Sequence, residues 1–153
     1  MKKTLVMTAL LASTIAMAEE PKTAQPLPQN QPMMKLAVYD MSNKVAREVE
    51  KYSVKNKKNH LCWTAFNMPF EAQNKVVEIF TSPNKTKFSD GIGLVNTAKD
   101  GKTHTITANL PSQNNEFIQR CWQFDNKDPL GKYSVKVQIN DIEFPVQTFE
   151  VAK

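Results

Sequence analysis

Two cysteines, Cys62 and Cys121, carry the chemistry that is easiest to predict from this chain. Neither lies in a Cys-x-x-Cys motif and each lies in a stretch typical of a β-strand, so a redox pair is disfavoured. A metal site built on His60 and Cys62 lacks a third ligand nearby. In a chain with an export signal, described below, two cysteines are expected to form a disulfide. Closing a loop of about 60 residues stabilises a fold by roughly 4 kcal/mol in the chain-entropy model.

A tryptophan follows each cysteine, at Trp63 and Trp122. Neighbouring residues of a strand point to opposite faces, so each indole lies opposite its cysteine. If the disulfide lies in the core, both indoles face outward and form an aromatic platform for a glycan or a peptide. If the disulfide lies outside, both indoles belong to the core, which is favoured because large aromatics are commonly buried in small domains.

The densest run of positive charge is the segment 55–60, in which Lys55, Lys57 and Lys58 lie close together. As a loop, this segment could contact an anionic surface such as lipopolysaccharide, an acidic glycan or phospholipid headgroups. The simpler interpretation is a solvated loop. The three lysines are therefore candidate binding residues together with the two tryptophans.

Four methionines lie beyond the first 18 residues, and their thioethers suit Cu(I). Only Met33 and Met34 are adjacent, while Met41 and Met68 lie apart. Copper handling in the periplasm is therefore a weaker alternative.

Motifs of catalysis are absent from the sequence. It contains only two histidines, and it lacks a Gly-x-Ser-x-Gly elbow, a phosphate-binding glycine loop and a His-Glu-x-x-His motif. Carboxylates such as Glu78 and Asp90 are numerous but follow no pattern, although a pair could converge in space. The sequence predicts a protein that is not an enzyme and that has no cofactor and no metal site.

The first 18 residues have the three parts of a secretory signal. Met1-Lys2-Lys3 is basic, Thr4 to Ile15 is uncharged and largely apolar, and Ala16-Met17-Ala18 has the small-x-small form of a cleavage site. The apolar run is shorter than the 20 or so residues that cross a membrane. The sequence predicts cleavage after residue 18, no transmembrane segment in the mature protein, and a periplasmic, secreted or cell-surface location in a Gram-negative bacterium.

Residues 19–33 are rich in proline and glutamine and have few apolar side chains, which predicts a flexible leader. Loss of Lys2 and Lys3 with the signal lowers the formal net charge from +5 to +3. This charge is too small for a nucleic-acid-binding protein.

The pattern of residues 34–153 predicts one all-β domain. Short alternating or aromatic-rich runs separated by turns are typical of a β-sandwich or barrel. The segment 41–52 fits either a helix or a strand and stays ambiguous. The expected strands cover residues 60–66, 75–81, 103–110, 117–124, 133–139 and 143–151.

The run from Asp128 to Tyr133 carries a resemblance to a known family. Pro129 and Gly131 turn the chain, and a strand then begins with Tyr133 pointing inward. The run resembles the Pro-x-Gly-x-Tyr entry to the penultimate strand of bacterial immunoglobulin-like domains. The resemblance implies an antiparallel immunoglobulin-like β-sandwich, in which the tyrosine can hydrogen-bond back across the corner. Val135 stands where antibody domains have a cysteine, so the disulfide must differ from theirs.

This fold leaves function open, because such sandwiches perform unrelated roles. The leading hypothesis is a non-catalytic binding or accessory module that contacts another envelope or surface protein, through edge strands or exposed aromatics. The alternatives are a carbohydrate or anionic glycolipid bound by the tryptophans and the basic loop, and copper handling.

Overall fold

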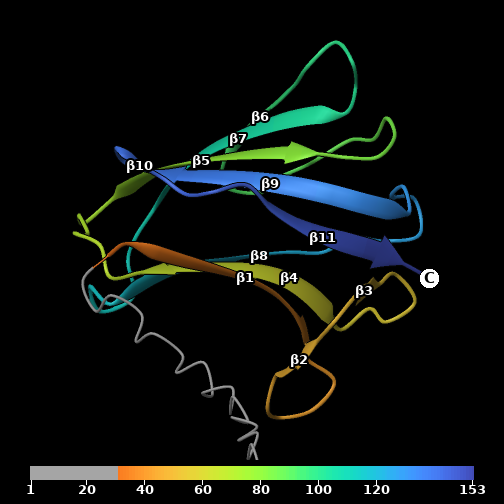
Figure 1. Ribbon diagram of the computed structural model, residues 1–153, viewed down its shortest axis with the longest axis horizontal. Coiled ribbons are helices and arrows are strands. Elements are labelled where there is room, and N and C mark those ends of the chain that lie inside the picture. Colours follow the sequence, from red (N-terminus) through yellow and green to blue (C-terminus); the bar gives the residue numbers. More distant parts are fainter. Residues whose placement is uncertain (1–30) are drawn as a thin grey trace, which may run out of the picture.

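The computed structural model describes residues 31–153 as two stacked β-sheets (Figure 1). The predicted signal peptide and all but the last three residues of the predicted leader lie outside these residues. The strands, in chain order, are β1 (Met33–Asp40), β2 (Arg47–Val49), β3 (Tyr52–Ser53), β4 (Asn59–Phe66), β5 (Asn74–Thr81), β6 (Leu94–Thr97), β7 (Thr103–Leu110), β8 (Phe117–Trp122), β9 (Gly131–Ile139), β10 (Ile142–Glu143) and β11 (Gln147–Ala152).

The smaller sheet has four strands in the order β2-β1-β4-β8, and the larger has seven, in the order β3-β11-β9-β5-β7-β6 with β10 beside β9. All pairings are antiparallel except that of β3 with β11. The described residues include no helix that could cross a membrane. The prediction of an all-β sandwich is confirmed.

The core lies between the sheets because apolar side chains alternate along the strands. In β9 the side chains of Tyr133, Val135, Val137 and Ile139 are buried, and the intervening residues are less so. The same period of two recurs in β5 and β7. Each strand therefore contributes one face to the core, as the sequence pattern indicates.

The chain turns into β9 at a tyrosine corner. The hydroxyl of Tyr133 donates a hydrogen bond of 2.7 Å to the carbonyl oxygen of Pro129. Gly131 has a φ of 130°, which a residue with a side chain adopts only with strain. The sequence Pro-x-Gly-x-Tyr is needed here because the proline bends the chain, the glycine permits the backbone angle and the tyrosine closes the corner.

The structure departs from the predicted strands at three places. The ambiguous segment 41–52 is no helix: it contains β2 and ends in β3, and Val45 faces solvent. The predicted strand 143–151 is interrupted at Pro145, which cannot donate a backbone hydrogen bond. β1 and β6 were not predicted, and β1 begins at Met33, the last residue of the predicted leader.

Candidate functional site

The disulfide joins Cys62 and Cys121 within one sheet, so the predicted bond is confirmed. The two cysteines are direct partners in the register of β4 and β8, with Cα atoms 4.0 Å apart. Cys121 is exposed and Cys62 is 4% exposed, and neither cysteine belongs to the cluster of core residues, which contains their strand neighbours Trp63 and Trp122. The bond therefore ties neighbouring strands on the outer face of the smaller sheet, whereas the antibody disulfide joins two sheets.

Because the disulfide lies outside, both tryptophans point into the core. Trp63 is 1% exposed and Trp122 is 9% exposed. Both indole N–H groups donate to the same atom, Oε1 of Glu78, at 2.6 and 2.7 Å. Of the two alternatives that the sequence allowed, the structure has the buried one. The alternative in which Trp63 and Trp122 form an exposed platform for a glycan or a peptide is therefore wrong.

Glu78 is the centre of a buried charge network. Its Oε2 lies 3.0 Å from Nη1 of Arg120, and the other guanidinium nitrogen of Arg120 contacts Asp90. The guanidinium also lies over the Trp122 ring, 4.7 Å from its centroid. Burial raises the pKa of Glu78, while the nearby Arg120 and the indole hydrogen bonds oppose the rise.

The network fixes the segment 82–93, which connects β5 to β6. Asp90 holds one part of this segment to Arg120 of the smaller sheet, and Phe88 stacks on His104 of β7 with centroids 4.5 Å apart. The carboxylates of Glu78 and Asp90 converge on Arg120 here, which is a possibility that the sequence left open. However, Glu78 is fully buried, and none of the network's charged residues lines a cavity described below. The arrangement therefore has the features of a structural anchor.

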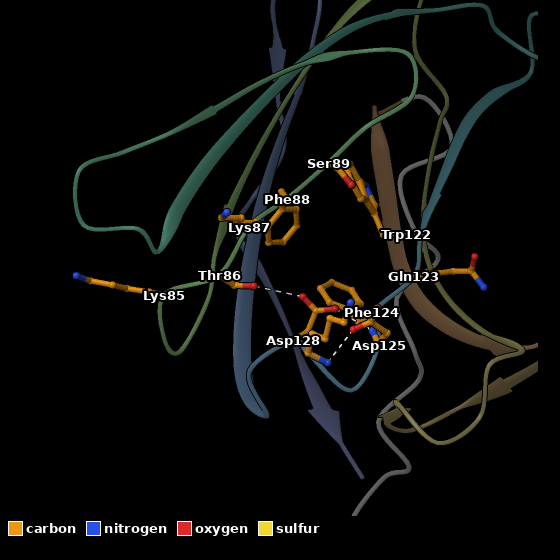
Figure 2. A pocket seen from close by; sticks show the side chains of 11 residues that line it. Lys85, Thr86, Lys87, Phe88, Ser89, Trp122, Gln123, Phe124, Asp125 and Asp128 are labelled. Carbon is orange, nitrogen blue, oxygen red and sulfur yellow. Dashed lines mark hydrogen bonds between the residues drawn. The ribbon is translucent and has the colours of Figure 1, made fainter.

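A groove lies at the end of the sandwich where the chain terminates. It has two adjoining parts, of about 580 and 900 Å³, which share Gln123, Phe124 and Asp125. Figure 2 shows Phe88, Trp122 and Phe124 around the first part. Tyr52 lines the second part, where its hydroxyl lies 2.9 Å from the carbonyl oxygen of Asn59 and accepts the N–H of Phe124. These bonds fix the groove's floor between the sheets.

Six exposed lysines line this groove, from four separate parts of the chain. They are Lys85, Lys87 and Lys127 in the first part and Lys55, Lys57 and Lys153 in the second. None of the six forms an ion pair with another residue of the described chain. We call this surface the lysine groove. The structure brings Lys55 and Lys57 to it, and Lys58 is exposed outside it.

Two aspartates also line the lysine groove, and both are used by the turn before β9. Asp128 accepts the N–H of Asp125 at 2.8 Å and the hydroxyl of Thr86 at 3.3 Å. Asp125 accepts the N–H of Lys127 at 2.7 Å. Burial, and then the charge of Asp125, raises the pKa of Asp128. Six lysine side chains against two aspartate side chains leave an excess of positive side-chain charge at the groove.

The methionines do not gather at one exposed place. Met33 and Met34 are consecutive in β1 and so point to opposite faces, Met41 follows the other end of β1, and Met68 is buried. Within residues 31–153, no three His, Cys, Asp or Glu side chains are grouped to hold a metal.

Edge strands are the second kind of exposed surface. The strands at the ends of the two sheets are β2, β8, β3 and β6. β2 and β3 are short, and β8 carries the inward-pointing charge of Arg120, which contacts Asp90 of the segment 82–93. β6 pairs with β7 and with no other described strand, and it carries no charge and no proline. Leu94, its first residue, is 75% exposed, and Ile92, which lies two residues before the strand, is 70% exposed. β6 is therefore an edge strand that has neither charge nor proline to prevent pairing with another chain.

The topology defines the class of protein. β1, β4 and β8 lie in the order of strands A, B and E of the immunoglobulin fold, and β5, β9 and β11 lie in the order of C, F and G. Together with the tyrosine corner, this order makes the protein an immunoglobulin-like β-sandwich. The chain belongs to the family described as PM0630 beta sandwich domain, whose model matches residues 34–152.

The chain is also similar to a full-length relative and, more distantly, to a solved structure. The chain is 30% identical over 159 residues to the protein PM0630 of Pasteurella multocida (strain Pm70), and the match covers 100% of both chains. Among solved structures, it is similar to an immunoglobulin-like protein from Pseudomonas aeruginosa, with 11% identity and a TM-score of 0.47, over 80% of this chain and 98% of that one.

Proposed function

We propose that this protein is a non-catalytic binding module of the bacterial cell envelope that pairs with another envelope protein through β6. The open edge of β6 is the observation that carries this proposal. An extended segment of a partner can add to such an edge through main-chain hydrogen bonds, and this mode of binding needs no sequence motif. The apolar side chains of Ile92 and Leu94 would contact the partner segment.

The location rests on the predicted secretory signal in residues 1–18. The disulfide supports it, because such bonds persist in the periplasm and outside the cell and are rare in the cytosol. Glu78 and Asp90, the two carboxylates that converge in the interior, are both paired with Arg120, so this pair has a structural use.

Site-specific photo-crosslinking in the envelope tests the proposal. A photoreactive residue at Asn96, which is exposed in β6, is expected to cross-link to one defined partner. Leu94→Lys in the same chain is expected to abolish the product, because an edge lysine prevents strand addition. Val146→Lys is the matched control, since Val146 is likewise an exposed apolar residue, 60% exposed, but lies outside β6.

Two results would count against strand addition at β6. One is a cross-link yield at Asn96 no greater than from the same photoreactive residue at Val146. The other is an Asn96 product that survives Leu94→Lys undiminished.

A further inference from the structure

The lysine groove has an excess of positive charge, because six lysines line it against two aspartates and none of the six is ion-paired within the described chain. Its six lysines come from the turn after β3, the segment after β5, the turn before β9 and the C-terminal residue. Surface lysines are ordinarily scattered and solvated, whereas these surround one concave surface. Like charges held around a cleft focus the field within it and attract an anion.

The shape of the groove argues against a flat anionic surface as the ligand. Its two parts are hollows that lie side by side and share Gln123, Phe124 and Asp125 as lining residues. A membrane contacts protruding groups, while a chain can enter a depression and follow its length. An elongated ligand with several negative charges fits this arrangement.

The floor of the groove distinguishes a peptide from a sugar chain. Sugars stack on exposed aromatic faces, yet Tyr52, Trp122 and Phe124 are each less than one-tenth exposed. Phe88, the fourth aromatic residue of the lining, is partly buried and is stacked on His104. Leu130, by contrast, is 42% exposed at the groove's second part. This offers an apolar contact beside the lysine charges, which matches a peptide whose acidic residues are interspersed with apolar ones.

We propose that the lysine groove binds an acidic peptide segment of a partner protein, with aspartate or glutamate carboxylates at the lysines and an apolar side chain at Leu130. This inference rests on the proposed function in that the partner is a protein. It adds a second contact, because no residue of β6 lines the groove.

A fluorescence-anisotropy titration tests the groove on the whole mature chain with its disulfide intact. The probe is a labelled octapeptide of six glutamates with leucine at positions three and six, and the reference is the same peptide with glutamines. The acidic peptide is expected to bind saturably, and the glutamine peptide at least tenfold more weakly. Lys57→Gln/Lys127→Gln is expected to weaken binding of the acidic peptide about tenfold, since two exposed charge contacts each contribute roughly fivefold or less.

The control variant is Lys44→Gln/Lys75→Gln, which removes the same charge from two exposed lysines outside the groove that form no ion pair within the described chain. It is expected to keep the affinity within twofold. Equal weakening by both double variants would overturn the groove and leave only a general charge effect. Absence of saturable binding at millimolar peptide would also overturn it. Tighter binding of an oligoguluronate of equal charge, or of phosphatidylglycerol vesicles, would replace the peptide by an acidic glycan or a lipid surface.

Failure here and failure of the proposed function are distinguishable. If the peptide does not bind but Asn96 still cross-links to a partner, the groove proposal alone is wrong. If the peptide binds at the groove but Asn96 captures nothing, strand addition at β6 is wrong and the groove stands.

Discussion

At the scale of single residues, Glu78 has the most unusual position in the protein. It is fully buried between the sheets, where it accepts two indole N–H groups and lies beside Arg120. A buried charge is tolerated only when paired and hydrogen-bonded. The conformation of the segment 82–93 depends on this arrangement because Asp90 also contacts Arg120.

Replacing Glu78 by alanine is expected to lower the free energy of unfolding by about 3 to 5 kcal/mol, because one partner of a buried ion pair is removed. Urea denaturation followed by circular dichroism measures this change. Glu143→Ala serves as the control, since Glu143 pairs with Lys136 on the surface and such pairs contribute about 0 to 1 kcal/mol. Similar losses in the two variants would show that the network is not a stabilising anchor.

The burial of His104 leads to a prediction of how the stability of the fold depends on pH. Its ring is buried against Phe88, and burial lowers its pKa below the ordinary value of 6.5, with Asp100 opposing the change. The unfolded chain then binds the proton more readily than the folded one. The contribution to stability is therefore complete above pH 6.5 and is lost as the pH falls through the folded-state pKa.

The unfolding free energy is expected to change little between pH 7.5 and 6.5 and to decrease between pH 6.5 and 5.5, by at most about 1.4 kcal/mol per pH unit from this one group. His104→Phe is expected to reduce the decrease, and His60→Gln to leave it in place because His104 is kept. An unchanged pH profile in His104→Phe would assign the dependence to other groups.

At the scale of the elements, the strand pattern was largely predictable and the site was not. Period-two alternation identifies β9 because each inward side chain is apolar. The same alternation places Glu78 inward, between Val76 and Phe80, and this is the one signal in the sequence for the buried network. The lysines of the groove have no such signal, since Lys55 and Lys127 meet only through the folding of distant turns.

The absence of β6 from the predicted strands has a physical explanation. β6 has four residues and lies at an edge, so only one side is paired and its side chains are mostly exposed. Its pattern therefore does not show a buried face. Both the tyrosine corner and the disulfide, in contrast, depend on residue types that have few other uses, and these could be identified from the sequence.

The tyrosine corner can be tested by removal of one oxygen. Tyr133→Phe removes the hydrogen bond to Pro129 and is expected to cost about 1 kcal/mol of unfolding free energy. Tyr39→Phe is the matched control, because the hydroxyl of Tyr39 has no hydrogen bond to a residue of the described chain, and it is expected to change stability by less than about 0.5 kcal/mol. Equal stability of the two variants, measured in urea, would mean that the corner is held by packing alone.

At the scale of the whole molecule, the charged network joins the sheets at the centre, and the disulfide holds only one sheet. Trp63 and Trp122 come from β4 and β8 of the smaller sheet, and their shared acceptor comes from β5 of the larger one. The sheets can separate only if these bonds break. Both indoles should consequently report the loss of the same interface.

We therefore expect the described domain to unfold in one cooperative transition with the disulfide intact. Trp63→Phe and Trp122→Phe each leave one indole as a probe, and in each variant the fluorescence midpoint in urea should coincide with that of far-ultraviolet circular dichroism. Both variants are less stable than the parent chain because Glu78 loses a donor, so the comparison is made between the two probes within each variant. A fluorescence transition at lower urea than the loss of β-structure would show that the sheets separate before their strands do, and that the Glu78 network holds the sandwich together less firmly than the pairing within each sheet.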